Sequence, residues 1–191
     1  MNEGPDELGE KQAVRLGGFM LNSVPRPDFV IASPYLRARR GAEMAAAIAW
    51  PGMVVVIDDR LIEQNKGTDE GDYYEDDNLM DRPYPGGQTL RQVGHHVLDL
   101  LHDPDYADAH IVVVTHARLM LANRVTTGRQ DYLALRDQGL PNGIHGIMIG
   151  NCDVDTYDRP DPASPWFTEM RVRQTWGDNP LDSGLIPIPQ E

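Results

Sequence analysis

The sequence holds one cysteine, Cys152, and among its 17 basic residues the only lysines are Lys11 and Lys66. A lone cysteine excludes an internal disulfide framework and fits a reducing compartment, so we expect a cytoplasmic protein. No apolar run approaches the roughly 20 residues of a membrane span. The polar, acidic start MNEGPDELGEKQ also lacks the basic-then-apolar grading of a signal peptide. We therefore expect a chain with neither a membrane span nor a leader.

Positive charge is scarce as well, because the formal net charge is -13. Such an acidic chain repels phosphate backbones and anionic lipids at long range, which argues against a nucleic-acid or membrane partner. Any anionic ligand must therefore be held by local charge. Three arginines, Arg37, Arg39 and Arg40, gather behind the short apolar run FVIAS. Arginine has a planar fork of donors that suits phosphate or carboxylate, although its excess over lysine can equally follow from genome composition.

The length of 191 residues, 40% of them hydrophobic, suits one domain with a sizeable core. Apolar runs that fit buried strands alternate with segments of helical spacing, which predicts an α/β fold with a mostly parallel sheet. We expect the domain to cover residues 1–175 and an extended tail to follow over 176–191. The expected helices are 6–21, 34–49, 89–101 and 117–127, and the expected strands are 29–33, 53–57, 111–115 and, shorter, 144–149, 153–157 and 167–173.

Between the second strand and the third helix lies a long, acidic, aperiodic stretch, residues 58–87. A loop of this length inside a compact domain is usually a functional lid or a disordered segment. Its run of Asp and Glu residues would disfavour a highly anionic substrate unless those side chains point outward. We expect it to cover the ligand site.

Two of the expected strands end in residues that can bind an anion. FVIAS is followed by PYLRARR, and IVVVT is followed by His116. In an open parallel sheet the ligand crevice lies beyond the carboxyl ends of the strands. If these two strands are neighbours, Arg37 and His116 face one small anion, supported by backbone N–H groups at the starts of the following helices. The sequence thus predicts a phosphate site made by Arg37 and His116.

Less specific explanations stand beside this one. An arginine in the first turns of a helix is most often solvated, and a histidine at a strand end is often only structural. Arg39 and Arg40 point elsewhere on the helix and are expected at the surface. His95, His96 and His102, with Asp99 nearby, could suggest a metal site, but a polar helix face explains them better.

Five segments carry motifs and cover about residues 6–127. In chain order they are ELGEKQAVRLGGFM, SPYLRARRGAEMAA, RLIEQNKGTDEG, PGGQTLRQV and VVVTHARLM. In the same order they resemble L-T-x-x-G-x-x-Q-A, S-x-x-x-R-A-x-x-T-A, R-L-x-E-x-x-x-G-x-x-E-G, P-G-G-E-S and the strand ending in the second histidine of the histidine phosphatase superfamily, the phosphoglycerate mutase-like proteins. Each motif is weak alone, but unrelated sequences rarely supply all five in register.

The resemblance implies a three-layer α/β/α sandwich that hydrolyses or transfers a phosphoryl group through a phosphohistidine. By the same resemblance Arg37 grips the phosphoryl oxygens, His116 donates a hydrogen bond to them, Glu63 protonates the leaving oxygen and Asn2 touches the phosphate. It implies no metal or nucleotide cofactor. The implied ligand is a small phosphorylated molecule or inorganic phosphate.

One departure from the family pattern is large: the R-H-G motif with the nucleophilic histidine does not occur. We therefore expect the family's first strand to be missing and the chain as written to be catalytically inactive. Loss of that strand would leave sheet edges open, which would favour a homodimer. Two other interpretations stay open: a non-catalytic protein that binds a phospho-ligand or a partner, and a gene fragment whose upstream codons encode the lost strand.

Overall fold

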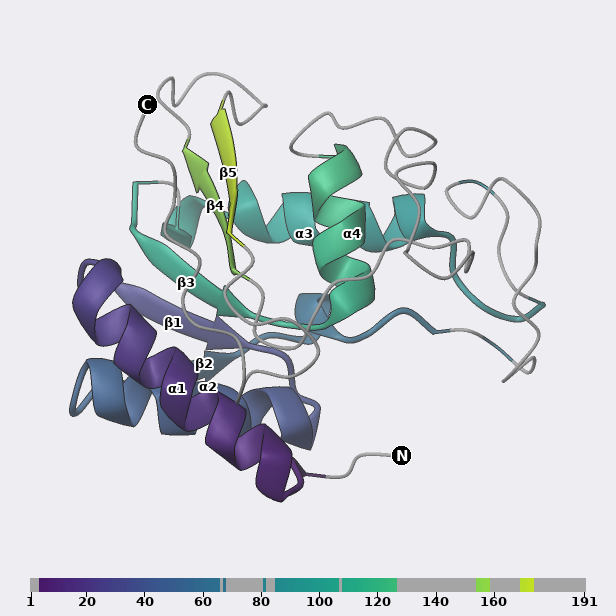
Figure 1. Ribbon diagram of the computed structural model, residues 1–191. Coiled ribbons are helices and arrows are strands. Elements are labelled where there is room, and N and C mark those ends of the chain that lie inside the picture. Colours follow the sequence, from purple (N-terminus) through teal and green to yellow (C-terminus); the bar gives the residue numbers. More distant parts are fainter. Residues whose placement is uncertain are drawn as a thin grey trace.

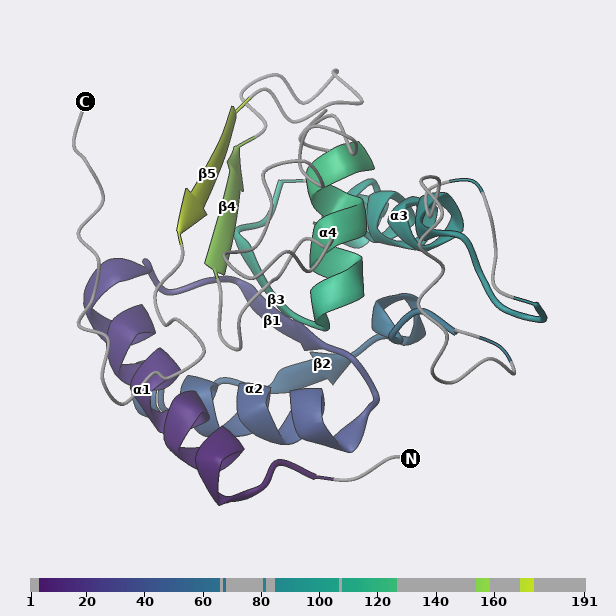
Figure 2. The same cartoon turned by 45° about the vertical axis from the view of Figure 1, so that its right-hand side comes forward.

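The computed structural model describes residues 4–65, 67, 81, 85–106, 108–126, 154–158 and 169–173. Within these residues an open, three-stranded parallel sheet lies between two pairs of helices (Figures 1 and 2). This is the α/β class expected from the sequence, and the layers form an α/β/α sandwich. Along the chain the elements are α1 (Glu7–Ser23), β1 (Phe29–Ala32), α2 (Leu36–Ala49), β2 (Val55–Ile57), a 3₁₀ turn (Asp59–Leu61), α3 (Leu90–Leu101), a second 3₁₀ turn (Pro104–Tyr106), β3 (Ile111–Val114), α4 (Ala117–Thr126), β4 (Val154–Asp158) and β5 (Glu169–Arg173).

The three strands of the sheet lie in the order β2-β1-β3, and both pairings are parallel. Val30 is in register with Val55 on one side and with Val112 on the other. Since parallel strands run in the same direction, the carboxyl ends of β1 and β3 lie next to each other. The condition placed on the Arg37–His116 site, that its two strands be neighbours, is therefore met.

Side chains alternate between the two faces of the sheet, as strand geometry requires. Val30 and Ala32 of β1 pack with α1 and α2, together with Val112 and Val114 of β3. Ile31 faces the opposite way and packs with α3 and α4. The sheet thus separates two hydrophobic cores, one on each face.

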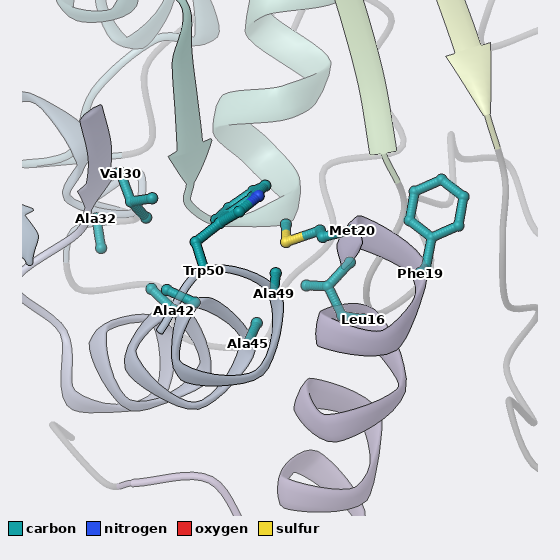
Figure 3. Packing of buried hydrophobic residues seen from close by; sticks show 10 residues of the cluster. Leu16, Phe19, Met20, Val30, Ala32, Ala42, Ala45, Ala49 and Trp50 are labelled. Atoms are coloured by element: carbon teal, nitrogen blue, oxygen red, sulfur yellow. The ribbon is translucent and has the colours of Figure 1, made fainter. Parts of the chain in front are cut away.

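The core under α1 and α2 is built from small residues on α2 and larger ones on α1. Leu16 and Met20 of α1 point toward Ala49 and Trp50 at the end of α2 (Figure 3). The two helices approach so closely that a Cβ on Gly17 would lie 2.8 Å from the backbone oxygen of Ala45. The alanine-rich face of α2 is what permits this approach.

The core under α3 and α4 includes a helix whose N-terminus is capped. Thr89 and Gln92 form a capping box at the start of α3: Thr89 Oγ1 accepts from the Gln92 N–H at 3.0 Å, and the Gln92 side chain accepts from the Thr89 N–H at 2.8 Å. Farther along, Gly94 lets Thr126 of α4 approach, since a Cβ there would lie 2.4 Å from Thr126 Cγ2.

Arg60 joins the turn after β2 to the segment after α3. Its guanidinium forms ion pairs with Asp58 at 2.6 Å and with Asp103 at 2.8 Å, and it donates to the Asp99 carbonyl oxygen at 3.2 Å. The hydrogen bonds from Arg60 lower the pKa of Asp58. This contact fixes the path by which the chain leaves β2 toward Glu63.

The expected helices and strands that fall within the described residues are present, with four differences. α1 runs to Ser23 rather than to residue 21. α2 begins at Leu36 rather than at Pro34, because the extended Tyr35 is its N-cap and the Tyr35 N–H donates to Ser33 Oγ. β2 begins at Val55 rather than Met53, because the Met53 N–H donates to the Trp50 oxygen in a turn. β2 is only partly buried where a buried strand was expected, since among the described strands it pairs with β1 alone; β3, on the other side of β1, is half-buried as well.

β4 and β5 form a separate two-stranded antiparallel sheet, with Thr156 in register with Arg171. They agree with the short strands expected over 153–157 and 167–173. The strand expected over 144–149, the tail expected over 176–191 and most of the acidic stretch 58–87 lie outside the described residues.

Candidate functional site

The site lies where β1 and β3 end side by side. The Ser33 N–H continues the β1–β3 ladder by donating to the Val114 oxygen at 3.1 Å. This bond places the residue after β1 next to Thr115 and His116, which follow β3. α2 then begins three residues beyond Ser33, and α4 begins immediately after His116. Two polar strand ends and two helix starts therefore meet at one edge of the sheet.

Arg37 and His116 are in direct contact although 79 positions separate them. Arg37 Nη2 lies 3.2 Å from His116 Nδ1. Arg37 is exposed on the first turn of α2, whereas His116 is 6% exposed and belongs to the buried polar residues. The structure thus brings together the two side chains that the sequence assigned to one anion, an exposed arginine and a buried histidine.

Burial determines the charge of His116. Loss of solvent, and secondarily the positive charge of Arg37, lower the pKa of His116 to about 4. The imidazole is therefore neutral at pH 7. Arg37 is the only positive charge in this contact, and it is placed where an incoming anion would meet it first.

Ser33 and Tyr35 also belong to the site, although the sequence predicted a role for neither. Ser33 Oγ lies 2.8 Å from His116 Nε2. The Tyr35 ring meets the imidazole edge-on with 5.3 Å between the ring centroids, and the Arg37 guanidinium lies 5.3 Å from the same Tyr35 ring centroid. One sequence feature could have indicated Ser33: it is a hydroxyl residue directly after an apolar strand, at the edge of the sheet where ligands bind.

The two helix starts favour an anion at this edge. α2 has no side-chain hydrogen bond at its N-cap Tyr35, and its first turn holds no acidic residue. The N-terminus of a helix carries partial positive charge and backbone N–H groups without partners inside the helix. With Arg37 on the first turn of α2, the helix dipole and the guanidinium attract the same kind of ligand.

Glu63 lies on a segment that passes beside the end of β3. Thr115 Oγ1 donates to the Leu61 carbonyl oxygen at 3.2 Å, which brings the chain two residues before Glu63 next to the neighbour of His116. Glu63 is half-buried, and its Oε1 accepts from the Gln64 N–H at 2.9 Å. The buried Gln64 in turn donates to the Gln88 oxygen at 2.7 Å, which ties this segment to the start of α3.

The other residues that the sequence singled out are placed as follows. Arg39 and Arg40 are exposed, and Arg39 pairs with Glu43 one turn along α2 at 2.8 Å. His95 and His96 are exposed on α3. Within the described part of the chain, no three His, Cys, Asp or Glu side chains are placed to hold a metal ion. Asn2 lies outside the described residues.

Two surface hollows lie away from His116, along α1 and α2. One, of about 440 Å³, is bordered by Glu7, Glu10 and Lys11 of α1 and by Met44 of α2. The other, of about 170 Å³, lies beside Pro5 and also includes Glu10. Neither contains a residue of the Arg37–His116 contact, and the first is lined by acidic and basic side chains in equal number, because Lys11 and Arg15 stand beside its two glutamates. Among the helices described, none is long and apolar enough to cross a membrane.

Comparison with known proteins identifies the family to which this chain belongs. Residues 6–142 match the family model of the histidine phosphatase superfamily (branch 1), so the chain belongs to that superfamily. No curated protein matches the sequence.

Solved structures of several phosphatases and hydrolases share the fold. A mycobacterial glucosyl-3-phosphoglycerate phosphatase is 22% identical, with a TM-score of 0.56 over 71% of this chain and 74% of its own. The protein named mycobacterial hydrolase 2 is 18% identical, with a TM-score of 0.65 over 98% of this chain and 83% of its own. A protein from Thermus thermophilus is 27% identical, with a TM-score of 0.50 over 65% of this chain and 71% of its own.

Proposed function

We propose that this chain binds the phosphoryl group of a small phosphorylated molecule, or inorganic phosphate, between Arg37 and His116. The observation that carries the proposal is the 3.2 Å contact between these side chains at the adjacent ends of β1 and β3. The helix starts of α2 and α4 add partial positive charge at the same edge. The mycobacterial phosphatase of similar fold has been solved with inorganic phosphate and with VO3, which supports a ligand of this type.

Within the superfamily the associated chemistry is hydrolysis or transfer of a phosphoryl group. We assign Arg37 to the phosphoryl oxygens, His116 to a hydrogen bond that stabilises charge on them during transfer, and Glu63 to protonation of the leaving oxygen. Asn2 is assigned to the phosphate from the sequence alone. The R-H-G motif that supplies the nucleophile in this family does not occur in the 191 residues. We therefore expect binding without appreciable turnover by this chain.

Calorimetric titration with inorganic phosphate tests the binding site. Arg37→Ala removes charge-assisted hydrogen bonds, each of which contributes about 1.5–3 kcal/mol, so phosphate affinity should fall about 10- to 100-fold. Arg39→Ala is the matched control, because Arg39 is exposed on the same helix and pairs with Glu43. Equal affinity in the Arg37→Ala variant and the unaltered chain would refute the assignment of Arg37.

Turnover of para-nitrophenyl phosphate by the purified chain distinguishes the two functions that the family membership allows. Phosphate binding with no turnover favours a phospho-ligand-binding protein. Turnover that His116→Ala abolishes would show instead that another group replaces the missing nucleophile. The second outcome would overturn the expectation of inactivity and leave the binding site in place.

A further inference from the structure

Ser33 is the most deeply buried polar residue of the site. It exposes 0% of its surface, and its Oγ is engaged on two sides. His116 Nε2 lies 2.8 Å away, and the Tyr35 backbone N–H donates to the same oxygen at 3.3 Å. Ser33 is therefore bonded to the inner side of His116, opposite the nitrogen that meets Arg37.

These contacts define which nitrogen of His116 carries the proton. A guanidinium has N–H donors and no acceptor, so His116 Nδ1 accepts the hydrogen bond from Arg37. In a neutral imidazole the other nitrogen then carries the hydrogen, and His116 Nε2 donates to Ser33 Oγ. Ser33 consequently accepts two hydrogen bonds, from His116 and from Tyr35, while its own hydroxyl proton takes no part in either.

A serine oxygen at hydrogen-bond distance from an imidazole is also the arrangement of an activated nucleophile. Burial excludes that role here, because a phosphorus atom would have to reach an oxygen with no exposed surface. The side of the imidazole that an anion can approach is the one facing the exposed Arg37. Ser33 therefore acts on a ligand only through His116.

Binding of phosphate creates a conflict at His116 Nδ1. An anion gripped by Arg37 reaches this nitrogen first, and a favourable contact needs an N–H there. In the empty site Nδ1 carries only a lone pair. Adding a second proton to the ring is disfavoured by its burial and by the charge of Arg37, the one charged group in contact with it among the described residues. The alternative is to move the proton from one nitrogen to the other.

We propose that Ser33 is a positioning residue that switches the tautomer of His116 when phosphate binds. In the empty site the Ser33 hydroxyl accepts from Nε2–H; in the complex it turns and donates its own proton to the Nε2 lone pair, while Nδ1–H donates to the phosphate. Nε2 loses one proton and Nδ1 gains one through solvent, so the ring stays neutral and no net proton is taken up. The switch rests on the proposed phosphate site.

Nitrogen-15 NMR of the histidine side chains tests the switch in the full chain, with His116→Gln used to assign the His116 signals. The empty protein should show a protonated Nε2 and an unprotonated Nδ1. Saturating inorganic phosphate should reverse the two. Phosphate binding with an unchanged tautomer, or with both nitrogens protonated, would overturn the switch and leave the proposed function intact. Absence of any phosphate-dependent change at Arg37 or His116 would overturn both.

A variant pair tests the part played by the hydroxyl. Ser33→Ala removes the partner of Nε2 from both the ligand-free and the phosphate-bound site, so His116 should no longer be held in a single tautomer, and phosphate should no longer reverse its two nitrogen-15 signals completely. Ser33→Thr keeps the hydroxyl and should bind as the unaltered chain does. A complete reversal in Ser33→Ala, equal to that of the unaltered chain, would refute the role of Ser33, and if Ser33→Ala does not fold, the NMR measurement on the unaltered chain alone decides.

Discussion

At the scale of single residues, the distribution of burial between Arg37 and His116 governs the chemistry of the site. The guanidinium is exposed and keeps its charge, while the imidazole is buried and loses its own at neutral pH. In the proposed site an anion would thus be attracted by one permanent charge rather than by two. This arrangement matters in a chain of net charge -13, whose distant carboxylates repel the same ligand.

The lowered pKa of His116 makes the stability of the fold depend on pH. The pKa is about 4 in the folded chain and about 6.5 in the unfolded one, so the unfolded state binds more protons between these values. Stability is therefore lost as the pH falls through this window. Urea unfolding at pH 7 and pH 4.5 should show the unaltered chain losing about 2–3 kcal/mol more than His116→Gln, whose side chain does not titrate. Equal losses would show that the buried imidazole protonates without cost.

Much of this site was predictable because it depends on strand ends. FVIAS and IVVVT are recognisable as strands from their apolar runs, and parallel strands place their carboxyl ends together, so the sequence alone could bring Arg37 and His116 to one edge. The contacts of Ser33, and with them its proposed role, could not be predicted. This role depends on which imidazole nitrogen faces which partner, and that is set by the three-dimensional contact of β1 with β3.

At the scale of elements, close helix approach depends on glycines that the sequence pattern does not single out. Gly17 and Gly18 are neighbours on α1, yet only Gly17 faces α2. A Cβ on Gly17 would lie 2.8 Å from the Ala45 oxygen and 2.9 Å from Ile48 Cβ, whereas a Cβ on Gly18 would meet nothing within 4 Å. The periodicity of apolar residues predicted the helix over 6–21, but it carries no information on the distance between α1 and α2.

The difference in free space around Gly17 and Gly18 gives a matched pair of variants. Gly17→Ala should destabilise the fold by about 1–3 kcal/mol, because the added methyl group forces α1 away from α2. Gly18→Ala should stabilise it by about 0.5–1 kcal/mol, because alanine is the better helix former and has free space. Urea unfolding measures both. A Gly17→Ala variant as stable as Gly18→Ala would mean that the two helices separate without cost.

Element boundaries were predicted less well than the elements themselves, for physical reasons visible at α2 and β2. The start of α2 depends on the Tyr35 N–H bonding to Ser33 Oγ, which holds Tyr35 extended. The start of β2 depends on the turn that Met53 closes onto Trp50. Both are local hydrogen bonds that compete with helix or strand, and an apolar run does not indicate which of the two prevails.

At the scale of the whole molecule, the sheet divides the interior into two cores that share few side chains. Met20 belongs to the core under α1 and α2, and Val97 belongs to the one under α3 and α4. Each is almost fully buried, and a layer of backbone separates them. Changes in one core are therefore transmitted to the other only through the strands.

Met20→Ala and Val97→Ala should each destabilise the fold by about 2–4 kcal/mol, since each leaves a buried cavity. Their effects should add, with a coupling energy below about 0.5 kcal/mol, because the two sites share no partner. Urea unfolding of the two single variants and of the double variant gives this coupling. A coupling well above that value would show that the sheet transmits packing changes from one layer to the other.

The contact between Arg37 and His116 joins positions that are 79 residues apart in the chain. An anion bound by both side chains would connect these distant positions reversibly, since it could bind only after β1 and β3 have paired. The unfolded chain would have no such binding site, so a higher ligand concentration would shift the folding equilibrium toward the native state. The same two side chains would then link occupancy of the site to the stability of the fold.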